Sequence, residues 1–376
     1  MNSLNRVTLS SLRNSLSIVA VLAYYLWAGT AFNVFDPNGY YNYLTRGLAS
    51  GHLYVPIEVN PKLLDLPDPY DPKIPDELKM HDMVMYKGRY YLYHGVAPVL
   101  MTFLPYRFLT RGKDLPEPIA VLIFVSLAFI CNVLTLPKPT PLSIFAVGFA
   151  NCIPFLLHRI FVYEVAIACG YFCLAAAFCL YYRNHLRWSG LFFGLAVLAR
   201  PHLGLALLFV KPQVWPTASI GIAAEAAYNY LRFGSPFEFG LSYLIAGPGQ
   251  QHPNFSIVNI LPGLYYFLLH PFDFRTLTIN GIAPFTPPPH FFLENIVGCL
   301  WLAPFIVLQK FSRLTAIGLA LLLFHASTGW ITQRYEVDFL PWLVLAALRN
   351  PVPWYLIPPG ILVNLMLHWR GPYNTQ

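Results

Sequence analysis

Eleven apolar runs recur along the chain, and they constrain its fold more than any other feature of the sequence. They lie near residues 16–32, 117–136, 141–158, 162–182, 188–200, 202–210, 214–231, 290–308, 314–331, 338–348 and 352–368. Charged residues make up only 11% of the sequence, whereas soluble domains carry about 25%. The sequence therefore predicts an all-α polytopic membrane protein, a bundle of about eleven transmembrane helices.

Basic residues predict the orientation of this bundle. With the N-terminus in the cytosol, the inner loops hold basic residues and no acidic ones: Arg6, Arg13, Lys138, Arg183, Arg187, Lys211, Lys310, Arg313 and Arg349. Such loops favour the cytosolic side. We expect one transmembrane domain over residues 1–376, multi-pass in the inner (plasma) membrane, with segments 34–116 and 229–289 outside the cytosol. The net charge of +7 is not gathered in a basic run, so no nucleic-acid partner is expected.

The first outer segment, residues 34–116, is the one long polar stretch near the start of the chain. Residues 39–54 predict an amphipathic helix whose tyrosines lie in the headgroup layer. Residues 56–76 are too rich in proline for a helix or a central strand. Aromatic and Met residues around Lys87–Gly88 predict a small hairpin with a tight turn. The apolar stretch 97–109 has only about 13 residues and is expected along the interface.

Three carboxylates are candidates for catalysis. Asp36 stands where the first apolar run ends, and it could take a proton from a hydroxyl or hold a divalent metal. Its alternative is a turn, since Asp-Pro-Asn-Gly is strong turn chemistry. Asp82 precedes the predicted hairpin and could equally be a solvated loop acid. Glu164 opens an apolar run beside Arg159, and a structural ion pair is its alternative role.

Four further residues could hold an anion. Arg200 interrupts more than twenty apolar residues, where a buried arginine is normally paired or faces a polar cavity. Pro201 follows it and breaks the helix, which frees backbone groups. Arg334 and Tyr335 mark the outer mouth of two late runs, and Arg232 is another cation at the outer side. The forked guanidinium of arginine suits a phosphate group.

The combination resembles the GT-C superfamily of integral membrane glycosyltransferases, in particular the bacterial branch related to protein O-mannosyltransferases and the lipid A aminoarabinose transferase. The resemblance rests on FDPNGYY, GLAVLARP, YNYLRFGSPFEFG and RYEVDFLP. It implies that Asp36 is the catalytic carboxylate of the first outer loop. It also implies that Arg200, Arg334 and Tyr335 lie near the phosphate of the lipid carrier.

The resemblance implies an inverting transfer of a sugar from a polyprenyl-phosphate donor to a lipid, glycan or protein acceptor on the extracytoplasmic side. The sequence does not determine whether the protein uses a cofactor: a divalent metal such as Mg²⁺ or Mn²⁺ could assist, but the sequence does not require one. A transporter or flippase of an anionic, lipid-linked substrate is the main alternative, because it too would place charge at membrane depth. A catalytically inactive membrane scaffold is the third.

Overall fold

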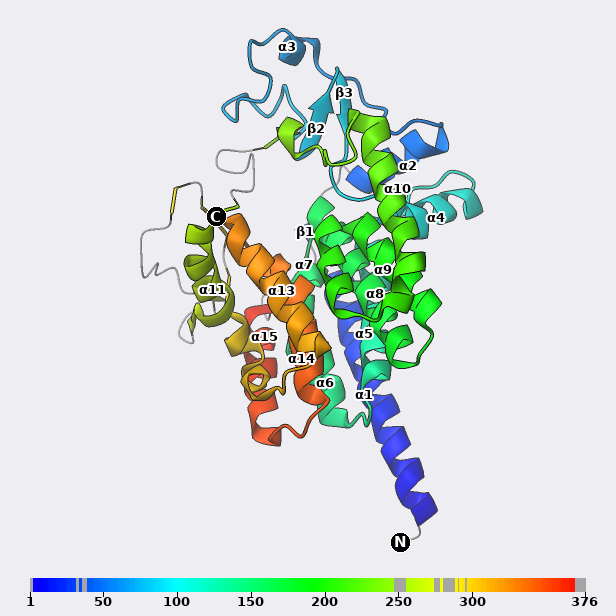
Figure 1. The fold of residues 1–376 in the computed structure, drawn as a ribbon, viewed down its shortest axis with the longest axis vertical. Helices are drawn as coiled ribbons and strands as arrows, with labels where there is room; N and C mark the ends of the chain where they lie inside the picture. Colours follow the sequence, from blue (N-terminus) through cyan, green and yellow to red (C-terminus); the bar gives the residue numbers. More distant parts are fainter. Residues whose placement is uncertain are drawn as a thin grey trace.

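The computed structural model describes residues 3–31, 34–35, 39–246, 255–273, 278–279, 288–289, 291–294 and 296–368. It is mostly helical, 67% by residue, with few and short strands. This confirms the all-α prediction at the level of fold class. The helices form two groups, and a polar cap lies above them in the view of Figure 1.

The first helical group is built around α8, whose side chains are almost all buried. Its members pack against α8 or against each other: α1 (Ser3–Ala31), α5 (Glu117–Thr135), α6 (Pro141–Phe149), α7 (Ile153–His158), α8 (Val162–Tyr182), α9 (Leu186–Ala199) and α10 (Trp215–Phe233). The N-terminal end of α1 projects away from the other helices (Figure 1). Gly234, at φ 78°, ends α10 in the left-handed conformation that glycine adopts without strain.

The second helical group comes from the C-terminal third of the chain. It contains α11 (Ile260–Leu269), α12 (Cys299–Leu302), α13 (Arg313–Thr328), α14 (Glu336–Leu348) and α15 (Ile357–His368). The helix α14 joins the two groups, because it packs on α13 on one side and on α6 and α8 on the other. Trp342 of α14 is fully buried there, with its ring 5.0 Å from that of Phe178.

Short 3₁₀ and π segments extend or connect these helices. They are η1 (Val99–Phe103, π), η2 (Pro201–Phe209), η3 (Pro212–Val214), η4 (Leu241–Tyr243), η5 (Ile257–Asn259), η6 (Pro304–Leu308), η7 (Gln333–Tyr335) and η8 (Trp354–Leu356). The longest, η2, continues α9 beyond Arg200, whose backbone is extended (φ −151°, ψ 105°). The helix therefore breaks at Arg200–Pro201, as the sequence predicted.

The predicted number of about eleven long apolar helices is wrong for the described part of the chain. Two helices there, α5 and α8, are long and apolar enough to cross a membrane. Several apolar runs are divided: the run 141–158 splits into α6 and α7 at Asn151, whose side chain bonds the backbone on both sides. The hydropathy of a run predicts that its residues avoid water, but it does not predict whether one continuous helix extends through the run.

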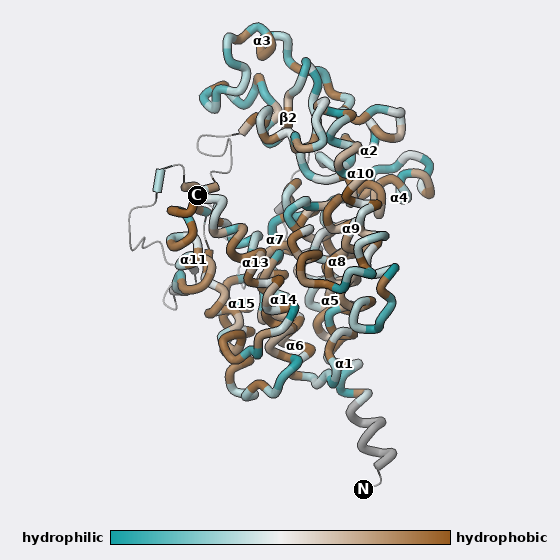
Figure 2. The backbone as a smooth tube through the Cα atoms, viewed as in Figure 1, coloured by the Kyte–Doolittle hydropathy of each residue, from teal (hydrophilic) through white to brown (hydrophobic). Residues whose placement is uncertain are grey.

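The cap comprises residues 39–112 and 234–246, and hydrophilic residues are frequent in its loops (Figure 2). Its elements are α2 (Tyr40–Ala49), α3 (Pro61–Leu64), α4 (Leu104–Leu109), β2 (Met83–Tyr86) and β3 (Arg89–Tyr91). The strands β2 and β3 form the predicted hairpin, with Tyr86 opposite Arg89. Lys87 and Gly88 both have positive φ, 50° and 70°, which is the geometry of a type I′ turn.

Pairs of short strands connect parts of the chain, and all of them except the local pair β6–β7 join segments that are distant in sequence. They are β1 (Val34–Phe35) with β4 (Arg159–Ile160), β2 with β5 (Leu244–Ile245), β6 (Phe272–Asp273) with β7 (Thr278–Ile279), and β8 (Phe292–Leu293) with β9 (Trp330–Ile331). Polar residues stand at or beside their ends. Asp82 precedes β2, Arg159 begins β4, Glu294 follows β8, and Arg334 lies three residues beyond β9.

Candidate functional site

The strand ends surround a cavity of about 360 Å³, called here the polar chamber. It is lined by Tyr40, His81, Asp82, Tyr93, Arg159, Phe161, Tyr163, Leu244, Phe292, Glu294, Trp330, Thr332, Arg334 and Tyr335. Two carboxylates and two guanidinium groups face the same small space. A ligand here would have to be polar and rich in hydrogen-bonding groups.

Arg334 is the centre of charge in the polar chamber. One Nη of Arg334 donates to Glu294 Oε2 at 2.7 Å, and its guanidinium lies 4.4 Å from the ring centre of Tyr163. Arg159 lies 3.8 Å from the same carboxylate, and Thr332 donates to it at 2.7 Å. Burial raises the pKa of Glu294, but the two arginines and the Thr332 hydroxyl lower it below its usual value. Glu294 is therefore ionised and balances Arg334.

Asp82 faces the polar chamber in an unusual backbone conformation. Its φ of 60° is rare for a residue other than glycine, and its N–H donates to the Ile245 carbonyl at 2.8 Å. Burial raises the pKa of the Asp82 carboxyl above its usual value, and His81, the Tyr163 hydroxyl and Arg334 offset only part of that rise. A carboxylate held in this way can accept a proton from a bound hydroxyl.

A second cavity, of about 470 Å³, is lined mainly by apolar side chains and is called here the apolar chamber. Its lining residues are Tyr93, His94, Gly95, Tyr163, Ala199, Arg200, Pro201, His202, Phe239, Leu241, Phe255, Phe324, His325, Thr328, Trp330 and Tyr335. Four of these, Tyr93, Tyr163, Trp330 and Tyr335, also line the polar chamber. The two chambers therefore lie on either side of a shared aromatic wall.

Arg200 belongs to a hydrogen-bonded cluster at the wall of the apolar chamber. Asp338 Oδ2 accepts from an Nη of Arg200 at 2.9 Å, from His202 Nε2 at 3.0 Å and from His325 Nε2 at 2.8 Å. The Arg200 guanidinium also lies 5.4 Å from the ring centre of Tyr335. Within the described residues, Arg200 Nε has no hydrogen-bond partner. The arginine therefore keeps a free donor although its charge is paired.

The same cluster contains the donor set that comes nearest to a metal site in the described residues. The ligand atoms of His202, His325 and Asp338 all lie within 4.8 Å of one another. Two imidazoles and a carboxylate suit Zn²⁺ or Mn²⁺. The Arg200 guanidinium, however, already bonds the Asp338 oxygen that a cation would need, and its charge opposes a second cation. The cluster fits a hydrogen-bonded network better than a metal centre.

The structure brings four of the predicted site residues together. Asp82 and Arg334 line the polar chamber, Arg200 lines the apolar chamber, and Tyr335 stands in the wall between them. Asp36, the first candidate for catalysis and for metal binding, lies outside the described residues.

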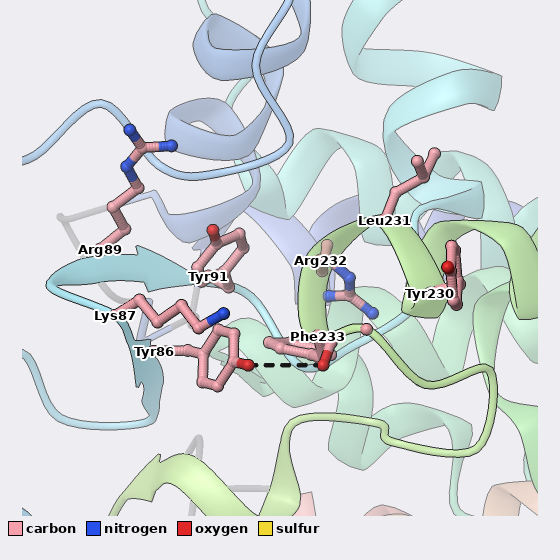
Figure 3. Close-up of a pocket in the computed structure, with 9 residues that line it drawn as sticks. Tyr86, Lys87, Arg89, Tyr91, Tyr230, Leu231, Arg232 and Phe233 are labelled. Carbon is pink, nitrogen blue, oxygen red and sulfur yellow. Dashed lines mark hydrogen bonds between the residues drawn. The ribbon is translucent and has the colours of Figure 1, made fainter.

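Glu164 and Arg232 line neither chamber. The Glu164 carboxylate is fully buried behind Arg334, 3.9 Å away, and accepts the Phe161 N–H at 3.0 Å, so it supports the start of α8. Arg232 lies in a separate groove between Tyr86–Tyr91 of the hairpin and residues 230–234 of α10 (Figure 3).

Glu294, His202 and His325 are among the chamber residues that were not predicted as site residues. His325 could have been noticed, because it is the one titratable side chain inside the run 314–331. Glu294 gives no such signal, since it meets Arg334 only through the pairing of β8 with β9.

In comparisons with known proteins, no protein family, no curated protein and no solved structure matches the chain. The function is therefore argued from the chambers themselves.

Proposed function

We propose that this protein is a membrane glycosyltransferase that transfers a sugar from a polyprenyl-phosphate donor to an extracytoplasmic acceptor. One observation carries the proposal: a polar chamber and an apolar chamber share an aromatic wall, and each has an arginine beside that wall. A polyprenyl-phosphate sugar has the same division, with a polar sugar, an apolar chain and an anionic phosphate between them.

In the proposed complex, the first isoprene units lie in the apolar chamber and the sugar lies in the polar chamber. The phosphate lies beside the shared wall, where Arg200 and Arg334 each approach the ring of Tyr335, at 5.4 and 5.8 Å. Guanidinium groups there would stabilise the charge that develops on the leaving phosphate. The donors already in place need no reorganisation, which is the condition for efficient electrostatic catalysis.

Asp82 is the carboxylate that the described residues favour as the base. The acceptor hydroxyl gives its proton to the Asp82 carboxylate, and its oxygen forms a bond to the anomeric carbon. The bond between that carbon and the phosphate oxygen breaks, and polyprenyl phosphate leaves with both electrons of the bond. Attack on the face opposite the phosphate inverts the anomeric centre.

The membrane placement is part of the same proposal. The helices α5 and α8 supply spans of full length, and shorter helices continued by 3₁₀ segments, such as α9 with η2, complete the bundle. Irregular backbone at membrane depth is tolerated where it is buried in protein or lines a cavity, and η2 lines the apolar chamber. The cap and the polar chamber then face away from the cytosol.

The first experiment separates the enzyme from a transporter or flippase. The purified protein in detergent is incubated with polyprenyl-phosphate-linked hexoses and a membrane glycolipid extract, and free polyprenyl phosphate is measured by mass spectrometry. A transferase releases the carrier without any vesicle, whereas a flippase has no gradient to act on and leaves the donor intact. Intact donor with every hexose and extract would count against the proposal.

The second experiment tests the phosphate role of Arg200 with a matched pair of variants. Arg200→Met and Asp338→Asn remove the same ion pair, and either change costs up to about 3–5 kcal/mol of stability because one buried charge loses its partner. Only Arg200→Met also removes the phosphate ligand. We expect polyprenyl-phosphate binding to be lost in Arg200→Met and retained in Asp338→Asn; binding retained in Arg200→Met would assign Arg200 a purely structural role.

A further inference from the structure

A third cavity lies apart from both chambers and shares no lining residue with them. This basic groove, about 560 Å³, is formed by Tyr86, Lys87, Arg89 and Tyr91 of the hairpin and by residues 230–234 at the end of α10. Figure 3 shows Tyr86, Lys87 and Tyr91 of the hairpin facing the end of α10, where the Tyr86 hydroxyl donates to the Phe233 carbonyl at 3.5 Å. The groove therefore joins the cap to the helical part of the molecule.

The groove carries three cations, Lys87, Arg89 and Arg232, and no acidic residue in its lining. Within the described residues, none of these three takes part in an ion pair with a carboxylate. This differs from Arg200 and Arg334, whose charges are paired. Glu225 lies close enough to interact with the charge of Arg232, but Lys87 and Arg89 add further positive charge. An excess of positive charge in a concave site favours an anionic ligand.

Arg232 gives the groove a fixed donor. Its side chain is only 4% exposed, and its two Nη groups donate to the Leu92 carbonyl and to Asn229 Oδ1, each at 2.6 Å. The Arg232 guanidinium also lies over the Tyr228 ring, 3.8 Å from its centre, and this contact further restricts its position. Within the described residues, Arg232 Nε has no hydrogen-bond partner. These contacts hold the positive charge of Arg232 in a fixed position beside the groove, where it attracts an anion without ordering a flexible side chain.

The rim of the groove is apolar. Tyr230 and Leu231 are 60% and 69% exposed, and Phe237 nearby is 85% exposed. If α10 crosses the membrane, as the proposed function requires, its end at residues 230–234 lies at the outer headgroup layer. Tyrosine and exposed apolar side chains are typical of that layer, and basic side chains just above it contact lipid phosphates.

We propose that the basic groove binds the phosphate of an acidic phospholipid headgroup in the outer leaflet. Lys87 and Arg89 contact the phosphate, and the buried charge of Arg232 adds to the attraction. Tyr230 and Leu231 contact the acyl chains where they leave the glycerol. The proposal rests on the membrane placement of the proposed function, and it does not depend on the sugar transfer itself. The apolar rim favours a lipid over a free anion, because a free anion gains nothing from exposed Leu231.

The test uses the purified full-length protein in neutral detergent and three probes: fluorescent phosphatidylglycerol, fluorescent phosphatidylcholine and soluble glycerol phosphate. We expect phosphatidylglycerol to bind more than tenfold tighter than phosphatidylcholine, with glycerol phosphate competing weakly. In the double variant Lys87→Glu/Arg89→Glu this preference should fall by roughly tenfold or more, because two cations become anions. Lys87→Gln/Arg89→Gln removes charge without reversal and should show a smaller loss.

The control is Lys62→Glu/Lys73→Glu, which makes the same charge change at two exposed lysines of the cap outside the groove. It should keep the preference for phosphatidylglycerol. Equal binding of both phospholipids by the unmodified protein, or an equal loss in the control, would overturn the proposal. Competition by glycerol phosphate as strong as that of the lipid would show a site for soluble anions instead. Release of polyprenyl phosphate, measured in parallel, reports on the transferase proposal independently.

Discussion

At the scale of single residues, the chambers keep their charges in pairs while leaving some donors free. Arg200 is paired with Asp338, and Arg334 is paired with Glu294. Burying an arginine without a partner would cost several kcal/mol, so pairing makes charge tolerable in these cavities. A ligand phosphate therefore meets arginines that are already oriented, and it competes with their carboxylates only in part.

Asp82 allows a prediction that separates activity from stability. Because Asp82 must be ionised to act as the base, and burial raises its pKa above the usual 3.8, the transfer rate should rise with pH through that raised pKa. Asp82→Asn should lower the rate by roughly 10²–10⁴-fold and remove this acid limb. The measurement is polyprenyl-phosphate release against pH for both proteins.

The raised pKa of Asp82 also determines whether Asp82→Asn stabilises or destabilises the folded protein. A carboxyl group whose folded pKa is raised favours the folded state below its unfolded pKa, and that contribution is lost as the pH rises through the folded pKa. At neutral pH, Asp82→Asn should therefore keep or raise the melting temperature. A lower melting temperature together with an unchanged rate would remove Asp82 from the mechanism and direct attention to Asp36.

At the scale of elements, α9 and α10 pack against each other through glycines. An added Cβ at Gly194 would lie 2.9 Å from the Ala218 carbonyl oxygen. An added Cβ at Gly221 would lie even closer to the backbone of Gly194. Small residues allow this close approach, as in membrane helix pairs. The contact fixes the position of α9, and thereby of Arg200 at its end.

Gly194→Ala should therefore destabilise the protein by about 1–3 kcal/mol through overpacking, measured as a fall in melting temperature. The matched control is Gly29→Ala in α1, where an added Cβ would make ordinary contacts at 3.6 Å or more. That variant should be neutral or gain up to about 1 kcal/mol from helix propensity. Equal effects in both variants would mean that the packing of α9 on α10 is loose.

Local chemistry explains which elements could be predicted from the sequence. The turn at Lys87–Gly88 and the break at Arg200–Pro201 depend on neighbouring residues alone, and both predictions are confirmed. The pairing of Asp338 with Arg200, His202 and His325 depends on how three elements pack, which no local pattern encodes. For the same reason no local pattern shows that Glu164 lies near Arg334, 3.9 Å away.

At the scale of the whole molecule, the proposed placement puts the cap outside the cytosol and the basic loops inside. Asp71→Cys, in an exposed loop of the cap, should react with a membrane-impermeant thiol reagent added to intact cells. Arg187→Cys, in the exposed first turn of α9, should react only after lysis. The six native cysteines are buried or half-buried, which keeps the background low. The reverse pattern of labelling would invert the topology and with it the proposed site.

The three-stranded sheet β3-β2-β5 has a consequence for how the protein is made. Met83 of the hairpin strand β2 pairs with Ile245 of β5, about 160 residues later in the chain. At synthesis rates of about 5–20 residues per second, the hairpin would wait roughly 8–30 s with one edge unpaired. An open strand edge is a template for wrong pairing. A nascent chain stalled before Leu244 should therefore be a better substrate for quality-control proteases than one stalled just after Ala246.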